Sequence, residues 1–465
     1  MQRSRKGQEQ YLTWLGFKRF ELELKRNHQK KERLKKKNLA FETLNKELGH
    51  DFSIENIYEK FLPSNIKFLV EHELLRKLLL KKYPDCKGTF KVPKCFSLTR
   101  TPKESYDLIF HILQSLVNQK YDNIIIDYAE CEEMELAAQI FLDVILYHYI
   151  KFLKECNKKK ILFRVKEIGS KNYKNEEIKK VLFSVGSIAI HGKQQYRYPD
   201  IIPYKLCIRN REKLISNISN AEQRDIDTTT LADYVLECLS CMKRTLTLEK
   251  LDNLCTVIGE ILINASEHST TKYRYSVGYF KENNENGTHT GVFHLLIFNL
   301  GDTIYEKFKD PNCPTQHIVE KMRNLSNNYI QKKFFFWKEF EEETLWTLYA
   351  LQDGVTSKAN FRRRGNGSIQ FIESFFSIKG TKKDFDDVSK LNILSGNTLI
   401  SFDGTYNISE KIDEGEKFKV MTFNKSGNIE EQPDKNFVKY ADHYFPGTMI
   451  SAKILLNEDD LIENK

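Results

Sequence analysis

Three polar side chains share one face of a segment that the sequence predicts to be a helix. Glu260, Asn264 and His268 are spaced four residues apart, so on an α-helix they form a single polar stripe. Apolar residues between them, such as Ile261 and Leu262, can then face a core. The stripe lines one wall with a carboxylate, an amide and an imidazole, which are groups that hold cations and transfer protons. The alternative interpretation is the exposed face of an ordinary helix.

A second polar segment follows a predicted strand. Residues 292–299 read as a strand, and it runs directly into Leu300-Gly301-Asp302-Thr303. A glycine at this point lets the backbone turn sharply, so a binding loop and a simple turn after a strand are both consistent with the pattern.

A glycine-containing loop precedes another predicted helix. Gly365-Asn366-Gly367 follow three consecutive arginines, and the helix is expected over residues 368–376. Glycines let the backbone approach phosphates, a helix amino terminus presents free N–H groups, and guanidinium groups neutralise negative charge. The segment is therefore typical of a phosphate-binding loop, with a plain helix cap as the alternative.

These segments and a last predicted strand that begins at Gly447-Thr448 resemble the GHKL superfamily of ATPases. The superfamily includes histidine kinases, anti-sigma-factor kinases, DNA gyrase, MutL and heat-shock chaperones. The resemblance implies that Asn264 coordinates Mg²⁺, that Glu260 orients or deprotonates the attacking water, and that His268 supports the phosphate side.

The same resemblance assigns the other segments to the nucleotide. The strand end would meet the adenine, the loop around Gly365 would form the second glycine box and lid, and Thr448 would lie near the adenine. The nucleotide-binding residues expected in this way are Asn264, His268, Asn299, Gly301, Arg364, Gly365, Gly367, Ser368 and Thr448.

Two positions depart from the family pattern. The first glycine box normally reads Asp-x-Gly-x-Gly, but this chain has Asn299 at the aspartate and Thr303 at the second glycine. The asparagine oxygen can still accept a proton from the adenine amine, although that hydrogen bond loses its ionic assistance.

The first half of the chain shows a different pattern. Predicted strands at residues 90–98, 123–127 and 160–166 alternate with predicted helices, which favours an α/β layer with a largely parallel sheet. Residues 126–142 resemble the central strand, loop and helix of STAS domains, the anti-sigma-factor antagonist fold. Those antagonists carry a phosphorylated serine before the helix, whereas residues 134–138 here contain no hydroxyl. The resemblance therefore implies a docking or regulatory module.

Length and charge suggest how the chain is divided. With 465 residues, two or three domains are expected, and residues 1–50 hold fourteen Lys/Arg against six Asp/Glu, which is most of the net charge of +9. That segment can follow a nucleic acid, meet an acidic partner or form a solvated helix. The expected fold class is α/β and α+β, with a basic helical region (1–85), a STAS-like α/β domain (86–200), a helical connector (201–245), a GHKL-like α/β sandwich ATP-binding domain (246–457) and an acidic tail (458–465).

The expected function is an ATP-dependent switch. ATP and Mg²⁺ are the expected cofactors, and nucleotide closes the arginine-rich lid to control a protein partner or a homodimer. The alternatives are an anti-sigma-type serine kinase, or a non-catalytic module that binds nucleic acid or protein through a decayed site. A histidine kinase is disfavoured because residues 205–253 contain no histidine.

Nine scattered cysteines and the lack of a long apolar run favour the cytoplasm, with no membrane partner.

Overall fold

The chain divides into two compact units, within residues 1–195 and 196–465. The computed structural model describes residues 62–158, 163–190, 197–212, 219–243, 247–267, 269–285, 288–330, 340–355, 367–377, 389–413 and 416–457. The basic segment 1–50 and the tail 458–465 lie outside this part of the chain, so the expectations for them stay predictions.

Unit 1 contains a three-stranded parallel sheet in the order β1-β3-β5 and a separate parallel pair, β2 with β4. The strands are β1 (Thr89–Lys91), β2 (Cys95–Phe96), β3 (Asn123–Asp127), β4 (Glu133–Met134) and β5 (Glu167–Lys171). The helices are α5 (Ser64–Glu71), α6 (Arg76–Leu80), α7 (Pro102–Val117), α8 (Leu136–Lys158) and α9 (Glu176–Val185), with 3-10 turns η1 (Glu73–Leu75) and η2 (Ile188–Ile190).

Local sequence signals explain where helix α9 begins and ends. The Asn175 side chain accepts hydrogen bonds from the backbone N–H groups of Glu177 and Ile178, which otherwise have no partner in the first turn. The helix ends at Gly186, whose left-handed φ of 71° suits a residue without a side chain.

Helix α8 is the longest element of the core of unit 1. By length and composition it is apolar enough to cross a membrane, and 78% of its most apolar window is buried inside the protein. Burial of this kind is typical of a core helix. Asp143 and His148 interrupt its apolar sequence, and both side chains are buried.

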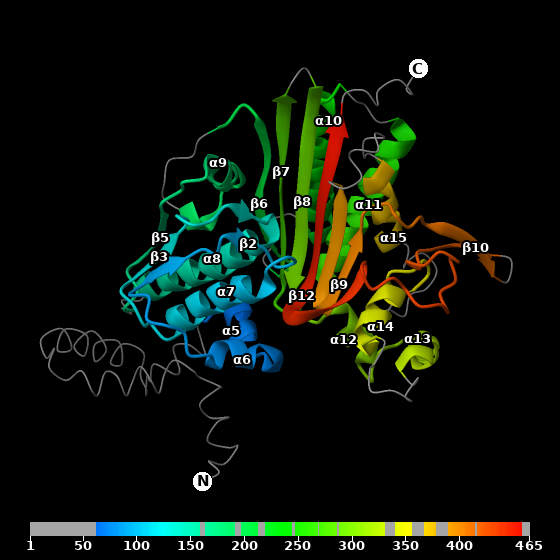
Figure 1. Ribbon diagram of the computed structural model, residues 1–465, viewed down its shortest axis with the longest axis horizontal. Coiled ribbons are helices and arrows are strands. Elements are labelled where there is room, and N and C mark those ends of the chain that lie inside the picture. The colour runs from blue at the N-terminus through cyan, green and yellow to red at the C-terminus, as the bar shows by residue number, and fades with distance from the viewer. Residues whose placement is uncertain are drawn as a thin grey trace, which may run out of the picture. The chain divides into compact units, whose positions relative to one another are not determined.

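Unit 2 is organised around a five-stranded sheet in the order β6-β7-β8-β12-β9, in which every neighbouring pair is antiparallel (Figure 1). The strands are β6 (Ile201–Asn210), β7 (Tyr273–Glu285), β8 (Thr288–Leu300), β9 (Lys390–Phe402) and β12 (Val438–Asn457), with a small hairpin of β10 (Ser409–Asp413) and β11 (Glu416–Val420). The helices are α10 (Asn220–Cys241), α11 (Leu248–Glu267), α12 (Ile304–Lys309), α13 (Gln316–Ile330), α14 (Glu342–Ala350) and α15 (Gly367–Ser377).

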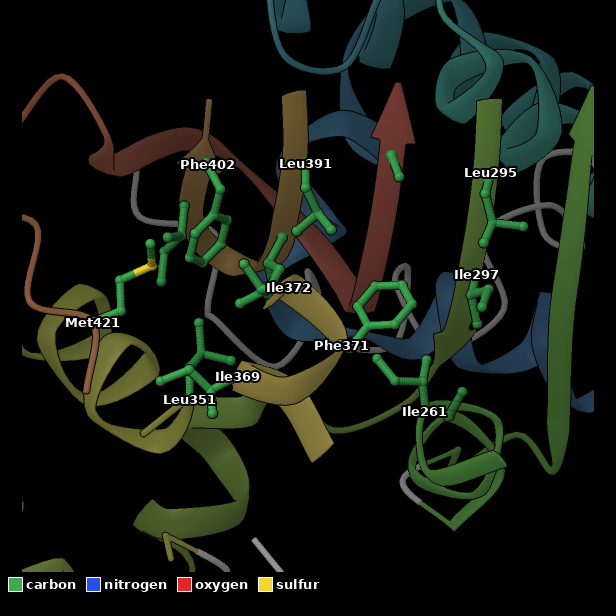
Figure 2. Close-up of a cluster of buried hydrophobic side chains, with 14 of the residues drawn as sticks. Ile261, Leu295, Ile297, Leu351, Ile369, Phe371, Ile372, Leu391, Phe402 and Met421 are labelled. Atoms are coloured by element: carbon green, nitrogen blue, oxygen red, sulfur yellow. The ribbon is translucent and has the colours of Figure 1, made fainter. Parts of the chain in front are cut away.

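The core of unit 2 lies between this sheet and a layer of helices. Side chains alternate along a strand, so Leu295 and Ile297 of β8 point to the same face. Figure 2 shows them in one buried cluster with Ile261 of α11 and Phe371 of α15. These four side chains are at most 3% exposed, and they fix the helices of the candidate site against the sheet.

The mixed α/β and α+β class expected from the sequence is confirmed at this level, because parallel and antiparallel sheets both occur. Three local expectations differ from the structure. The strand expected over residues 90–98 is divided into β1 and β2, with Pro93 between them. The third strand is β5, which begins at Glu167, and residues 163–166 before it are not part of a strand. Residues 201–210, expected in a helical connector, form strand β6 of the unit 2 sheet.

Candidate functional site

The two predicted adenine-side residues lie opposite each other on neighbouring strands. In the antiparallel register Asn299 at the end of β8 pairs with Thr448 of β12. Gly447 approaches the carbonyl oxygen of Asn299 so closely that any Cβ there would collide with it, and its φ of 147° also favours glycine. Gly301 donates its N–H to Pro446 O at 3.2 Å. The glycines therefore let two strand ends meet tightly.

Ser395 of β9 joins this junction, although the sequence analysis did not identify it. Its Oγ lies 2.9 Å from Thr448 Oγ1 and 3.2 Å from the carbonyl oxygen of Gly447. It also accepts a hydrogen bond of 2.9 Å from the backbone N–H of Ile304. A polar residue that interrupts the apolar alternation of a strand was the available signal. We call Asn299, Thr448 and Ser395 the strand-end cluster.

The strand-end cluster faces the helical layer. Asn299 continues the alternation of Leu295 and Ile297, whose side chains pack against the helices. Its side chain is only 2% exposed, and within the described part of the chain its Nδ2 has no hydrogen-bond partner. A buried amide donor without a partner costs free energy, on the order of 1–3 kcal/mol, unless a ligand or water accepts its proton.

Arg274 is the partner of Asn299 on the other neighbouring strand, β7. It forms a buried ion pair with Asp227 of α10, and both side chains are 3% exposed. Asp227 also accepts hydrogen bonds from Arg209 of β6, at 2.8–3.1 Å, and one of 3.0 Å from Gln223. The network ties two strands to helix α10.

Arg274 also fixes the helix that carries the polar stripe. Its Nη1 donates a hydrogen bond of 3.2 Å to the carbonyl oxygen of Leu262 in α11. The Oγ of Ser269, just after α11, donates to the carbonyl oxygen of Leu300 at 3.2 Å. The carboxyl-terminal part of α11 is therefore fastened beside the end of β8.

Of the predicted stripe, the structure places Asn264 in α11 with an exposed side chain. Ile261 and Leu262 are buried, as the helical spacing predicts. Glu260 belongs to the same helix, but its side chain lies outside the described residues. His268 also lies outside them. Asn264 is thus available to a ligand, and the polar face that it is expected to share with Glu260 and His268 stays a prediction.

The second glycine segment is described only from its last glycine. Gly367 is the first residue of α15, which packs against α11 through Phe371. Arg364, Gly365 and the side chain of Ser368 lie outside the described residues. The loop and lid expected there stay predictions, while the helix that follows them shares a core with α11.

Thr303, which replaces the second glycine of the family motif, caps helix α12. Its Oγ1 accepts a hydrogen bond of 3.1 Å from the backbone N–H of Glu306, and Glu306 Oε2 accepts one of 2.8 Å from the backbone N–H of Thr303. This reciprocal pair is a capping box, which needs a hydroxyl and a carboxylate three residues apart. The threonine therefore has a structural role that a glycine does not supply.

Glu343 of α14 is a titratable residue beside the strand-end cluster that the sequence analysis missed. Its Oε1 accepts a hydrogen bond of 2.6 Å from the backbone N–H of Asn397, two residues after Ser395. Burial raises the pKa of Glu343 to about 7, and the charges of Glu306 and Glu341 act in the same direction. Nothing in its local sequence distinguished it from the neighbouring glutamates.

Comparison of the chain with protein-family models, curated proteins and solved structures gives no match. In the described ranges, no group of three or more His, Cys, Asp or Glu side chains is arranged to hold a metal ion. Cys238, which forms the only Cys-x-x-Cys pair of the sequence with Cys241, packs in the core of unit 2.

Proposed function

We propose that unit 2 binds ATP with Mg²⁺ and acts as a nucleotide-dependent switch. The observation that supports this proposal is the strand-end cluster, in which Asn299 and Thr448 lie in register and the buried donor Asn299 Nδ2 has no hydrogen-bond partner among the described residues. Three strands that are distant in the sequence, β8, β9 and β12, supply the residues of this cluster, and helix α11 adjoins it. Purine bases carry hydrogen-bond donors and acceptors on the same edge, which suits a buried amide.

The residues of α11 fit the phosphate side of such a site. Asn264 is exposed and carries an oxygen of the kind that Mg²⁺ binds, so it would hold the cation. Bound Mg²⁺ would neutralise negative charge on the phosphates. Glu260, one helical turn earlier, would orient or deprotonate a water at the terminal phosphate. The loop around Gly365 and Arg364 would close over the nucleotide, and the closed form would bind a protein partner or a second copy of the chain.

The first test is Asn264→Ala. We expect its affinity for ATP in Mg²⁺ to fall at least roughly tenfold, because the cation loses a ligand, and its affinity in EDTA to stay unchanged. The matched control is Thr256→Ala, which alters another exposed side chain of α11. Titration calorimetry measures both. Equal ATP affinity of Asn264→Ala and the wild type in Mg²⁺ would show that Asn264 is not at the cation.

The second test separates turnover from binding. In Glu260→Gln we expect phosphate release from ATP to fall roughly 10²–10⁴-fold, because the amide cannot accept a proton from water, while ATP still binds. Asp252→Asn changes an exposed carboxylate on the same helix and serves as the control. Labelled ATP distinguishes the outputs, since label transferred to protein supports a serine kinase and release of free phosphate supports the switch.

A further inference from the structure

Asn299 is the residue of the strand-end cluster that is placed to distinguish one base from another. Its side chain is 2% exposed, and its Nδ2 has no partner within the described part of the chain. The flanking strands hold it in place, with Arg274 on one side and Thr448 on the other. Arg274 also leaves its Nε without a partner among the described residues. At one end of the sheet, two neighbouring buried donors thus lack acceptors among the residues that the structure describes.

A carboxamide and a carboxylate differ in what they offer to a purine. An ionised carboxylate only accepts hydrogen bonds, whereas the asparagine amide has both a donor nitrogen and an acceptor oxygen. In the present orientation Asn299 offers its nitrogen, which complements the carbonyl group of a 6-oxopurine. A half-turn about Cβ–Cγ exchanges nitrogen and oxygen, and the side chain then complements the amino group of a 6-aminopurine.

We propose that the site accepts 6-oxopurine and 6-aminopurine nucleotides with similar affinity, and that Asn299 causes this dual specificity. The proposal rests on the proposed function, because it concerns the base of the same nucleotide. A hydrogen-bonding site discriminates strongly only when the wrong base leaves a buried polar group unpaired. Asn299 avoids that outcome with either base because its amide can present either atom.

The probes are ATP and inosine triphosphate, which differ only at position 6 and in the proton at N1. We expect the full-length chain to bind both in Mg²⁺ with dissociation constants within about tenfold of each other. In Asn299→Asp, at pH 8, the carboxylate repels the 6-oxo group. The ratio of the two dissociation constants should then shift in favour of ATP by roughly ten- to a hundredfold. Asn299→Ser retains a group that both donates and accepts, so its ratio should stay near that of the wild type.

Asn428→Asp is the matched control. It makes the same chemical change on an exposed side chain, whose oxygen accepts a hydrogen bond from Glu430 N in either form. Wild-type preference for ATP of a hundredfold or more would overturn the inference, and so would an unchanged ratio in a folded Asn299→Asp. If Asn299→Asp does not fold, the inference is tested by the ratio of dissociation constants in the wild type and in Asn299→Ser. Failure of the wild type to bind either nucleotide would instead contradict the proposed function.

Discussion

Asp143 in unit 1 and Asn299 in unit 2 each keep a buried polar atom without a hydrogen-bond partner among the described residues. Asp143 Oδ1 accepts hydrogen bonds from Ser187 Oγ, the backbone N–H of Ala189 and Gln139 Nε2, at 2.9–3.1 Å. Asp143 belongs to a closed network inside one unit, whereas Asn299 lies where strand ends and the carboxyl-terminal part of α11 meet. We therefore interpret Asp143 as a determinant of stability and Asn299 as a ligand contact.

The buried carboxyl group makes the stability of unit 1 depend on pH. Burial raises the pKa of Asp143 from 3.8 to about 7, so the folded state prefers the protonated form. The protonated carboxyl group therefore adds to the free energy of unfolding of unit 1. This contribution is fully present below pH 3.8 and is lost as the pH rises to about 7, a change on the order of 4 kcal/mol. Asp143→Asn is neutral and retains the acceptor oxygen. We expect it to flatten this pH dependence and to stabilise unit 1 at pH 8.

Urea unfolding of the wild type and of Asp143→Asn between pH 4 and pH 8 measures the pH dependence of the stability of unit 1. Glu155→Gln changes an exposed carboxyl group on the same helix and should leave the pH dependence as in the wild type. A wild-type stability of unit 1 that does not fall between pH 4 and pH 7 relative to Asp143→Asn would contradict the assignment.

The buried ion pair in unit 2 gives a second prediction for a single residue. Asp227→Ala leaves the charge of Arg274 without its carboxylate in a site that is 3% exposed. We expect a loss of about 3–5 kcal/mol in the free energy of unfolding, because an uncompensated buried charge remains. Asp225→Ala removes an exposed carboxylate from the same helix, and its effect should stay below about 1 kcal/mol. A small effect of Asp227→Ala in denaturant unfolding would refute the structural role of the pair.

At the scale of elements, the candidate site depends on how closely the ends of β8 and β12 approach. Gly447 makes this approach possible, since a Cβ there would collide with Asn299 O. In Gly447→Ala we expect the strand ends to separate, at a cost of roughly 1–3 kcal/mol, and the affinity for ATP to fall. Gly427→Ala alters a glycine that also has a positive φ, of 66°, but an added Cβ there would meet only side-chain atoms at 3.6 Å or more, and the substitution should leave the affinity unchanged. Retained ATP affinity in Gly447→Ala would show that the junction does not contact the nucleotide.

The elements that the sequence predicted well have strong local signals. Strand β3 matches its predicted bounds because three isoleucines form one compact apolar run between Asn123 and Asp127, and helix α9 has equally local signals, a cap residue and a glycine at its ends. Strand β6 was missed because Pro203 and the surrounding polar residues resemble a boundary, although an edge strand tolerates proline. Ser395 and Arg274 were missed because their roles depend on pairing between distant strands, which no local pattern reports.

At the scale of the whole molecule, each unit has its own core, so the two units are expected to unfold separately. In calorimetry of the full-length chain, Asp227→Ala should lower one transition and Asp143→Asn should raise the other at pH 8. ATP with Mg²⁺ should raise the temperature of only the transition that Asp227→Ala lowers. At a nucleotide concentration one hundred times the dissociation constant, the free energy of unfolding of that unit should increase by about 2.7 kcal/mol. A nucleotide effect on the other transition would assign the binding site to unit 1.

Hydrogen–deuterium exchange of the full-length wild-type chain, with and without ATP and Mg²⁺, tests the central claim most directly. We expect slower exchange at the end of β8 around Asn299, at Thr448 of β12 and in the carboxyl-terminal half of α11, because a bound nucleotide orders these segments together. Slower exchange confined to unit 1, or no change at saturating ATP, would contradict the claim that the strand-end cluster of unit 2 binds a nucleotide.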